Sequence, residues 1–366
     1  LHSFPTRRSS DLEPATLLSR HAECAFWLGR YLERAESMAR ILEAQASFQR
    51  GRPGEDGWAW IIALYSDQER FHKKFPEATA ANVISFYVTW LDNPGSIQAT
   101  VRAARENARA LRPLISTDMW AQINDFYSRI LALGETDFSE NRLTRSCDMI
   151  KRGCYAEIGV AENTLYRDES WPFFRLGQFI ERADQTSRLL DVQFAQRATR
   201  GTPDKTSDQQ ASLWNALLRS ASAYHSYRRA HLSGFDPNDI ARFMIFDTRL
   251  PRSIAFCTGE IQRMVGKLRG EFRLRSAQRA YDHVERFQKD LQERGRNEKL
   301  LDELHGFNDW VQRELMELTA ELGTGLFGHQ PETENEAPEI AVPPKPSLGS
   351  SGQTQSQSSA QTQTQG

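Results

Sequence analysis

The sequence predicts an all-α protein, and three observations carry this prediction. Apolar residues recur at the helical period along nearly the whole chain. No stretch of useful length alternates apolar and polar residues, as a half-buried strand would. Breaks rich in glycine, proline and polar residues, such as 51–57 and 201–210, separate the periodic stretches. The expected helices span residues 18–49, 58–74, 78–91, 95–111, 117–132, 139–168, 172–199, 208–232, 237–247, 252–269, 273–293 and 297–321.

The first of these helices contains a sequence that returns in the seventh. LGRYLERAESMARIL, from Leu28 to Leu42, and LGQFIERADQTSRLL, from Leu176 to Leu190, share 7 of 15 residues. In each copy the apolar residues fall on one helical face. In the first copy Arg30, Glu33, Ser37 and Arg40 fall on the other face, so we expect these side chains to point away from the core.

Two further blocks repeat in the same order. WIIALYS begins at Trp60 and WNALLRS at Trp214, while NPGSI begins at Asn93 and LPRSI at Leu250. The offsets between copies are 148, 154 and 157 residues, so they drift only by the length of a loop. This order predicts a duplicated helical unit of about 150 residues, which is the size of an ordinary domain.

The chain is expected to form one helical domain with extensions at both ends. The domain covers residues 17–328, in halves of about 17–168 and 169–328. Residues 1–16 resemble a non-native or disordered leader. Residues 329–366 are rich in acidic residues, proline, glutamine and serine, a composition that predicts a disordered tail.

Charge and cysteine content narrow the class of protein. The net charge is −2, from 46 basic and 48 acidic residues, which gives no bulk attraction to nucleic acid or to an anionic membrane. No run of about 18 apolar residues is long enough to span a membrane. Four cysteines without a paired spacing fit a reducing compartment. The sequence therefore predicts a soluble, cytoplasmic protein that uses neither nucleic acid nor a membrane as a partner.

Two sites where an acid or amide precedes proline predict helix starts. Asp236 stands before Pro237, and Asn93 stands before Pro94. Each pair is expected to provide an N-cap followed by proline at the first helical position.

The Glu-Arg pair is the polar feature that both long copies keep, as Glu33 and Arg34 and again as Glu181 and Arg182. Each arginine borders the apolar face and can cross to a neighbouring helix while its stem packs on the core. The four residues form either a structural ion-pair network or a ligand site. Charged helix faces are usually paired, which favours the first interpretation.

A stripe of four arginines follows one side of the expected helix 95–111. Spacings of 3, 4 and 3 residues align Arg102, Arg105, Arg109 and Arg112, with Glu106 as their acidic neighbour in the helix. Such a stripe either pairs with carboxylates elsewhere in the fold or binds a phosphate or a peptide carboxylate. Packed arginine must find partners, which favours the first interpretation. Arg249 and Arg252 flank the second Pro-x-Ser-Ile block and are expected at the equivalent place in the other half.

The search for catalytic and metal-binding residues gives no site. Helical bundles hold metals with Glu-x-x-His pairs on facing helices. Glu69 with His72 has that spacing, and Asp302 with His305 resembles it, but the duplication supplies no second Glu-x-x-His pair. His283 is expected to be an ordinary histidine at the edge of the core. No nucleophile has a visible activating base, so the sequence predicts no cofactor, no metal and no catalytic residue.

Four segments resemble the bacterial Alpha-E domain family over about residues 17–325. They are LLSRHAECAFWLGRYLERAESMARILEA from Leu17, DNPGSIQATVRAARENARALRPLIS from Asp92, FFRLGQFIERADQTSRLLDV from Phe173, and LPRSI from Leu250. The resemblance implies an all-helical domain of unknown function. Its members are often encoded beside, or fused to, ATP-grasp-like proteins and transglutaminase-like peptidases. No catalytic residue can be carried over from the family.

The function expected from these observations is that of a non-catalytic binding or assembly module. Its partner would be an ATP-grasp-like protein that ligates peptide amides or a transglutaminase-like peptidase, and an acidic peptide is a possible ligand. The alternative is an enzyme in its own right, acting on peptides or their conjugates through carboxylates and arginines between the two halves.

Overall fold

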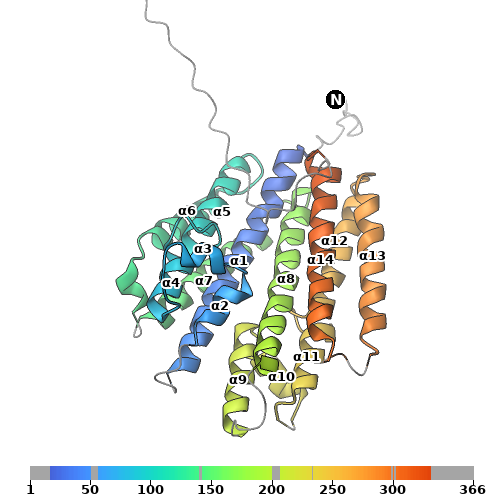
Figure 1. The fold of residues 1–366 in the computed structure, drawn as a ribbon. Helices are drawn as coiled ribbons and strands as arrows, with labels where there is room; N and C mark the ends of the chain where they lie inside the picture. The colour runs from blue at the N-terminus through green and yellow to red at the C-terminus, as the bar shows by residue number, and fades with distance from the viewer. Residues whose placement is uncertain are drawn as a thin grey trace, which may run out of the picture. The chain divides into compact units, whose positions relative to one another are not determined.

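The computed structural model describes residues 17–50, 57–139, 142–199, 207–232, 234–297, 300 and 302–330. In these ranges the chain forms helices and turns and no strand, which confirms the all-α prediction (Figure 1). The expected leader and nearly all of the expected tail lie outside the described residues. The elements are α1 (Ser19–Gln49), α2 (Ala59–Leu64), α3 (Gln68–His72), α4 (Ala80–Val88), α5 (Ile97–Ala110), α6 (Thr117–Leu131), η1 (Glu135–Phe138), α7 (Leu143–Thr164), α8 (Ser170–Thr199), α9 (Ser207–Ser220), α10 (Tyr224–Ala230), α11 (Pro237–Phe246), α12 (Ile254–Gly270), α13 (Ala277–Arg294), α14 (Leu304–Leu322) and η2 (Gly323–Phe327).

The two long helices that carry the repeated sequence, α1 and α8, lie against each other at the centre of this body. Each has a glycine at the point of contact. A Cβ on Gly29 would overlap the carbonyl oxygen of Phe174, and a Cβ on Gly177 would overlap the carbonyl oxygen of Phe26. The contact is reciprocal, with a glycine on one helix opposite a phenylalanine carbonyl on the other. The helix backbones can approach this closely only because neither glycine has a side chain.

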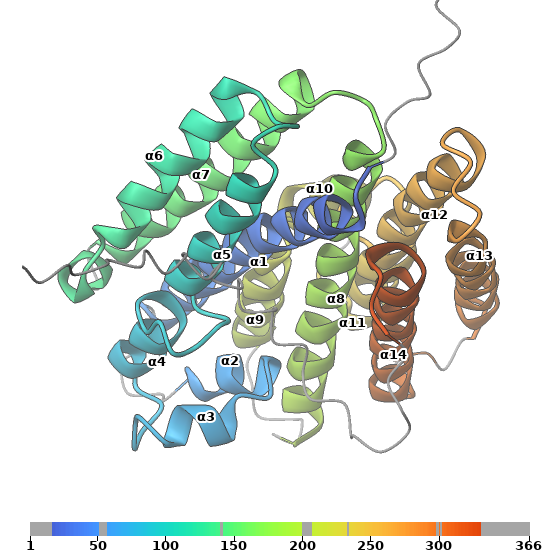
Figure 2. The same cartoon turned by 90° about the horizontal axis from the view of Figure 1, so that it is seen from above.

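The remaining long helices lie on two sides of the central pair. Figures 1 and 2 show α5, α6 and α7 on one side and α12, α13 and α14 on the other. α1 packs against α5 and α7, whereas α8 packs against α12 and α14. The short helices cross between the sides, because α2 packs on α8 and α9 packs on α1. The core is therefore continuous through the central pair.

α1 is enclosed on all sides, whereas its polar face was predicted to point toward solvent. The face expected to point outward contains Glu33, which is 1% exposed, and Ser37, which is 3% exposed. α1 contacts α5, α7, α8 and α9, so its polar face is enclosed as well as its apolar face. The prediction of an outward polar face was wrong for these two residues.

Two expected helices are each broken by a left-handed turn. The expected helix 58–74 divides into α2 and α3 at Ser66, and the expected helix 208–232 divides into α9 and α10 at Ser222; each serine has φ 54°. The Ser66 and Asp67 amides donate to Ala63 and Ile62, while the Ser222 and Ala223 amides donate to Arg219 and Leu218. This is a Schellman turn, in which a left-handed residue closes the helix. No glycine marks either position, which is why the sequence pattern did not reveal the breaks.

A helix starts at each of the two Pro-x-Ser-Ile blocks, and the serine of the block is its N-cap. Ser96 Oγ accepts a hydrogen bond from the Ala99 amide at the start of α5, and Ser253 Oγ accepts one from Phe256 at the start of α12. The prediction that Asn93 caps a helix was wrong, because its Oδ1 accepts from the Gly95 amide inside the preceding turn. The predicted cap at Asp236 is confirmed: its carboxylate accepts from two amides of α11, and Pro237 is the first helical residue.

The local geometry of the repeated blocks is the same in several places. The glycine contacts, the serine turns and the serine caps each occur once in either half. The duplication itself stays a prediction. Among the described residues, no helix combines the length and apolar character that crossing a membrane requires.

Candidate functional site

The two Glu-Arg pairs meet at the interface of α1 and α8, and each glutamate binds the arginine of the other helix. Arg182 donates from Nε and Nη2 to the two carboxylate oxygens of Glu33, at 2.8 and 2.9 Å. Arg34 donates in the same way to Glu181, at 2.7 and 3.0 Å. Both contacts are bidentate, the geometry in which a guanidinium group binds a carboxylate most strongly. The two sequence copies are thus joined by exchanged ion pairs.

Each of these glutamates also binds a second arginine. Arg30 Nε lies 2.9 Å from Glu181 Oε2, one turn before Arg34 on α1. Arg252 Nη1 lies 2.9 Å from Glu33 Oε1 and comes from the turn that precedes α12. Glu33 and Glu181 are 1% and 0% exposed. Two guanidinium groups compensate the desolvation of each carboxylate, as a buried charge requires.

The network extends outward through Glu36 to Tyr155 on α7. Arg252 Nη2 lies 2.5 Å from Glu36 Oε2. Arg40 and the hydroxyl of Tyr155 bind Oε1 of Glu36, the tyrosine at 2.6 Å. Tyr155 is 48% exposed, so this end of the network reaches the surface.

Electrostatics fix the ionisation of these carboxylates. Burial raises the pKa of Glu36, but Arg252 and Arg40 outweigh burial and hold the pKa at about 2. Burial likewise opposes ionisation of Glu181, and Arg34 and Arg30 lower its pKa to about 2. Both groups are anionic at neutral pH and have no proton to give. The arrangement joins α1, α8 and the turn that precedes α12.

The arginine stripe lies on the outside of α5 and of the turn that follows it. Its four arginines have different surroundings. Arg105 is held in place, because its Nε donates to Asn124 at 2.7 Å and its guanidinium lies 4.9 Å from the ring centre of Tyr127. Arg109 is exposed and pairs with Glu106. Arg102 and Arg112 are exposed, and Arg102 forms no hydrogen bond or ion pair with another residue that the structure describes. The stripe therefore presents positive charge to solvent at three positions.

Arg249 and Arg252, expected together at an equivalent place, lie in different surroundings. Arg249 is exposed and binds Asp247 two residues away, at 2.7 Å. Arg252 is 12% exposed and belongs to the interior network. The turn between α11 and α12 explains the difference, because Thr186 on α8 donates to the Arg252 carbonyl at 2.8 Å and holds this residue against the central helices.

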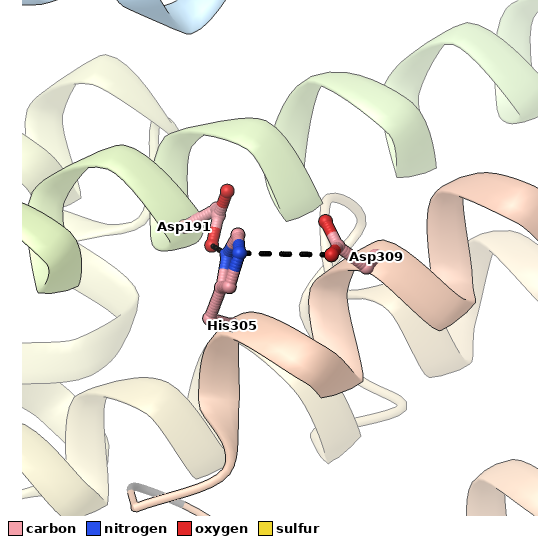
Figure 3. Close-up of side chains that lie close together, drawn as sticks. All are labelled: Asp191, His305 and Asp309. Atoms are coloured by element: carbon pink, nitrogen blue, oxygen red, sulfur yellow. Dashed lines mark hydrogen bonds and ion pairs between the residues drawn. The ribbon is translucent and has the colours of Figure 1, made fainter.

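The two pairs considered for metal binding do not form a site. Glu69 pairs with Lys73, and His72 contacts the carbonyl of Phe75. His305 binds Asp191 of α8 through Nδ1 at 2.7 Å, and Nε2 faces Asp309 at 3.6 Å, as Figure 3 shows. The hydrogen bond with Asp191 raises the pKa of His305. This exposed contact links α8 to α14.

Glu157 of α7 is an acidic group that the sequence pattern did not reveal. It is 0% exposed, and neither carboxylate oxygen has a hydrogen-bond partner among the described residues. Burial raises the pKa of Glu157 to about 8. The side chain is therefore largely neutral at pH 7. Its position four residues before the apolar Ala161 gave a weak signal of burial, because these two residues share a helical face.

The other residues missed by sequence analysis lie far apart in the chain. Arg30, Tyr155 and Gln185 join the network, and the Gln185 amide donates to Glu181 at 3.2 Å. Glu36 with Arg40, and Asp184 with Arg188, form ion pairs four residues apart within their own helices. No spacing rule predicts a contact between Tyr155 and Glu36, because the two residues belong to different helices.

The fold and this network define a class: an all-helical protein in which two central helices exchange buried Glu-Arg pairs. The chain belongs to the Alpha-E family. The family model matches residues 17–327 and is described as a predicted alpha-helical domain with a conserved ER motif. Glu33-Arg34 and Glu181-Arg182 are two instances of that sequence, one on each central helix.

The relatives that match this chain have no described function. They are uncharacterized proteins of Mycobacterium bovis and of two strains of Mycobacterium tuberculosis, each 24% identical over 255 residues. The match covers 63% of this chain and 28% of each relative. The chain thus spans less than a third of the length of these relatives. No solved structure matches it.

Proposed function

We propose that this protein is a non-catalytic helical module that binds an acidic surface of a peptide-modifying partner in the cytoplasm. The partner class is the one implied by the family resemblance, an ATP-grasp-like amide ligase or a transglutaminase-like peptidase. The observation that carries the proposal is a contrast between two sets of charges. The Glu-Arg charges neutralise one another in the interior, whereas Arg102 and Arg109 of α5, and Arg112 in the turn that follows, face solvent.

The α5 surface has the composition of a protein-binding site. Arg105 and Arg112 each lie 5.5 Å from the ring centre of Trp120, so guanidinium groups and an aromatic ring share one surface. Arginine and tryptophan are enriched among residues that contribute most to binding energy. Arg102 and Arg109 extend the positive charge along the helix. A partner with a row of carboxylates complements this surface.

The mycobacterial relatives support a modular role. The region that matches this chain is 28% of each relative, so the remainder of each protein has no counterpart in the match. A helical domain carried within a longer chain fits an assembly function.

The test is complex formation with the ATP-grasp-like or transglutaminase-like protein encoded beside this gene, measured by isothermal titration calorimetry. Replacing Arg102, Arg109 and Arg112 together with glutamine is expected to weaken binding at least about tenfold. The matched control replaces Arg145, Arg229 and Arg296, which are also exposed and lie on other helices and turns. It removes the same charge and should leave the affinity unchanged. Equal loss in both triple variants, or no complex with either partner class, would contradict the proposal.

The competing function is an enzyme that uses the carboxylates and arginines between the halves. The interior network argues against it, because Glu33, Glu36 and Glu181 each bind at least two guanidinium groups. Hydrolysis of a peptide conjugate by the purified protein, abolished by Glu36→Gln, would favour the enzyme instead.

A further inference from the structure

A second cluster of ionisable side chains lies between α13 and α14, which are neighbours on the outer side of the α12–α14 group (Figure 2). His283 of α13 is 2% exposed, and both of its ring nitrogens face carboxylates of α14. Nδ1 lies 3.1 Å from Glu321 Oε2, and Nε2 lies 2.9 Å from Glu314 Oε2. A third carboxylate, that of Glu317, stands one turn after Glu314 on the same helix.

These groups have the geometry of a metal donor set. One donor atom from each of His283, Glu314 and Glu317 lies within 4.8 Å of the other two. Two ligands bound about 2.1 Å from a metal at angles near 90–109° are about 3.0–3.4 Å apart. The 2.9 Å between His283 Nε2 and Glu314 Oε2 is close to that separation. A cation can therefore replace the shared proton with little movement of the helices.

Contacts around the cluster orient the donors. Glu321 on Nδ1 fixes the imidazole with Nε2 toward Glu314, the arrangement typical of histidines that bind metals. The indole Nε1 of Trp310 donates to Glu314 Oε1 at 2.9 Å and leaves Oε2 on the side of the histidine. Each contact is made to the atom of a ligand side chain that does not face the cation. Residues around a metal site commonly orient the ligands in this way.

Charge balance favours a cation. Three carboxylates surround the imidazole, and Arg279 is the one arginine or lysine that pairs with any of them among the described residues. Glu317 forms no hydrogen bond or ion pair with a described residue. With a neutral imidazole the set carries a charge of about −2, which a divalent cation neutralises. A groove of about 570 Å³ opens beside His283 and Glu321, and Arg275, Arg279 and Arg286 also line it.

We propose that His283 Nε2, Glu314 and Glu317 bind a divalent cation of the zinc or manganese class. Imidazole with carboxylates suits these ions. Three protein ligands leave a coordination position for water. The sequence predicted no metal because the duplication supplies no second Glu-x-x-His motif, whereas this set combines a histidine of one helix with a Glu-x-x-Glu pair of the next.

The cluster in Figure 3 also combines a histidine with two carboxylates and provides a comparison. Asp191 and Asp309 lie there at opposite ring nitrogens of His305 (Figure 3). One donor atom from each of these three residues also lies within 4.8 Å of the other two, but His305 is 74% exposed. The His283 cluster differs because it has a third carboxylate and a buried imidazole.

The test uses the full chain after treatment with a chelator, titrated calorimetrically with Zn²⁺ and separately with Mn²⁺. We expect one equivalent of at least one of these ions to bind. Glu321→Gln should weaken binding about 10–100-fold, and Glu317→Gln and His283→Gln at least as much. Glu317→Gln is the decisive variant, because Glu317 is exposed and its loss should leave the metal-free melting temperature unchanged.

Two controls separate this site from general charge effects. Glu285→Gln removes an exposed glutamate of α13, and His305→Gln removes the histidine of the comparison cluster. Both should bind one equivalent with the wild-type affinity. Absence of stoichiometric binding, binding that survives Glu317→Gln, or binding lost in His305→Gln alone would each overturn the proposal.

Discussion

Arg182 of α8 binds Glu33 of α1 through two parallel hydrogen bonds, and the residue next to each takes part in a second pair of the same kind. Glu33 is 1% exposed and Arg182 is 15% exposed. The pair is therefore largely excluded from water, and each charge is compensated mainly by the other side chain instead of by water. The ER sequence of one central helix completes that of the other.

Removal of one member of this pair should be costly. We expect Arg182→Met to lower the free energy of unfolding by about 3–5 kcal/mol, because Glu33 then stays buried with Arg252 as its remaining ion-pair partner. The double variant Glu33→Met with Arg182→Met should be more stable than the sum of the two single effects by at least about 1 kcal/mol. Urea unfolding followed by circular dichroism measures all three variants.

Arg109→Gln is the control for this cycle. Its ion pair with Glu106 is on the surface, with Arg109 61% exposed, so the change should stay within about 0.5 kcal/mol. Strictly additive effects of Glu33→Met and Arg182→Met would show that the exchanged pair does not couple α1 to α8.

The close approach of α1 and α8 should not tolerate a methyl group. We expect Gly29→Ala and Gly177→Ala each to lower stability by about 1–3 kcal/mol or more, because the new Cβ meets a backbone carbonyl that cannot rotate away. Gly159→Ala on α7 is the matched control, since no atom within 4 Å would meet its Cβ. That change should stabilise the helix by about 0.5–1 kcal/mol. A melting temperature of Gly29→Ala at or above the wild-type value would refute the close contact.

Glu157 should make stability fall as pH rises. Burial raises its pKa from the ordinary value of about 4.5 to about 8 in the folded protein. Below about pH 4.5 both states hold the proton. Between about pH 4.5 and 8 only the folded state holds the proton. The free energy of unfolding therefore falls by about 1.4 kcal/mol per pH unit across this window.

The variant Glu157→Gln removes this proton and isolates the effect. The free energy of unfolding of the variant relative to wild type should increase steadily from pH 5 to pH 8, measured by urea unfolding at each pH. Glu162→Gln, at a 53% exposed position of the same helix, should show no such trend. A difference between Glu157→Gln and wild type that is independent of pH would rule out a buried neutral acid.

Local patterns predicted helix positions well where apolar spacing and caps agreed. The expected helix 117–132 corresponds to α6, and Asp236 with Pro237 starts α11 as expected. The breaks at Ser66 and Ser222 were missed because a left-handed serine carries no distinctive signal in the sequence. Asn93 was misassigned because asparagine also stabilises turns through its own neighbouring amides, as it does with Gly95.

The sequence indicated the candidate site residues more readily than the residues with which they form ion pairs. Repetition singled out Glu33, Arg34, Glu181 and Arg182, and the wheel position of Arg34 indicated that it crosses to another helix. The sequence did not show that the two copies bind each other, that Arg252 joins them, or that His283 faces three carboxylates. Each of these facts depends on residues between about 30 and 220 positions apart, which no spacing rule connects.

The amino-acid sequence alone is enough to predict that the chain is helical, where most helices begin, and that one polar pair occurs on both long helices. These properties follow from periodicity and capping, which act over a few residues. The packing of the helices sets which sides of α1 are enclosed, which arginine binds which glutamate, and which arginines remain in water. Burial and long-range ion pairing depend on how whole helices pack, because the cost of a desolvated charge is set by all its neighbours in space.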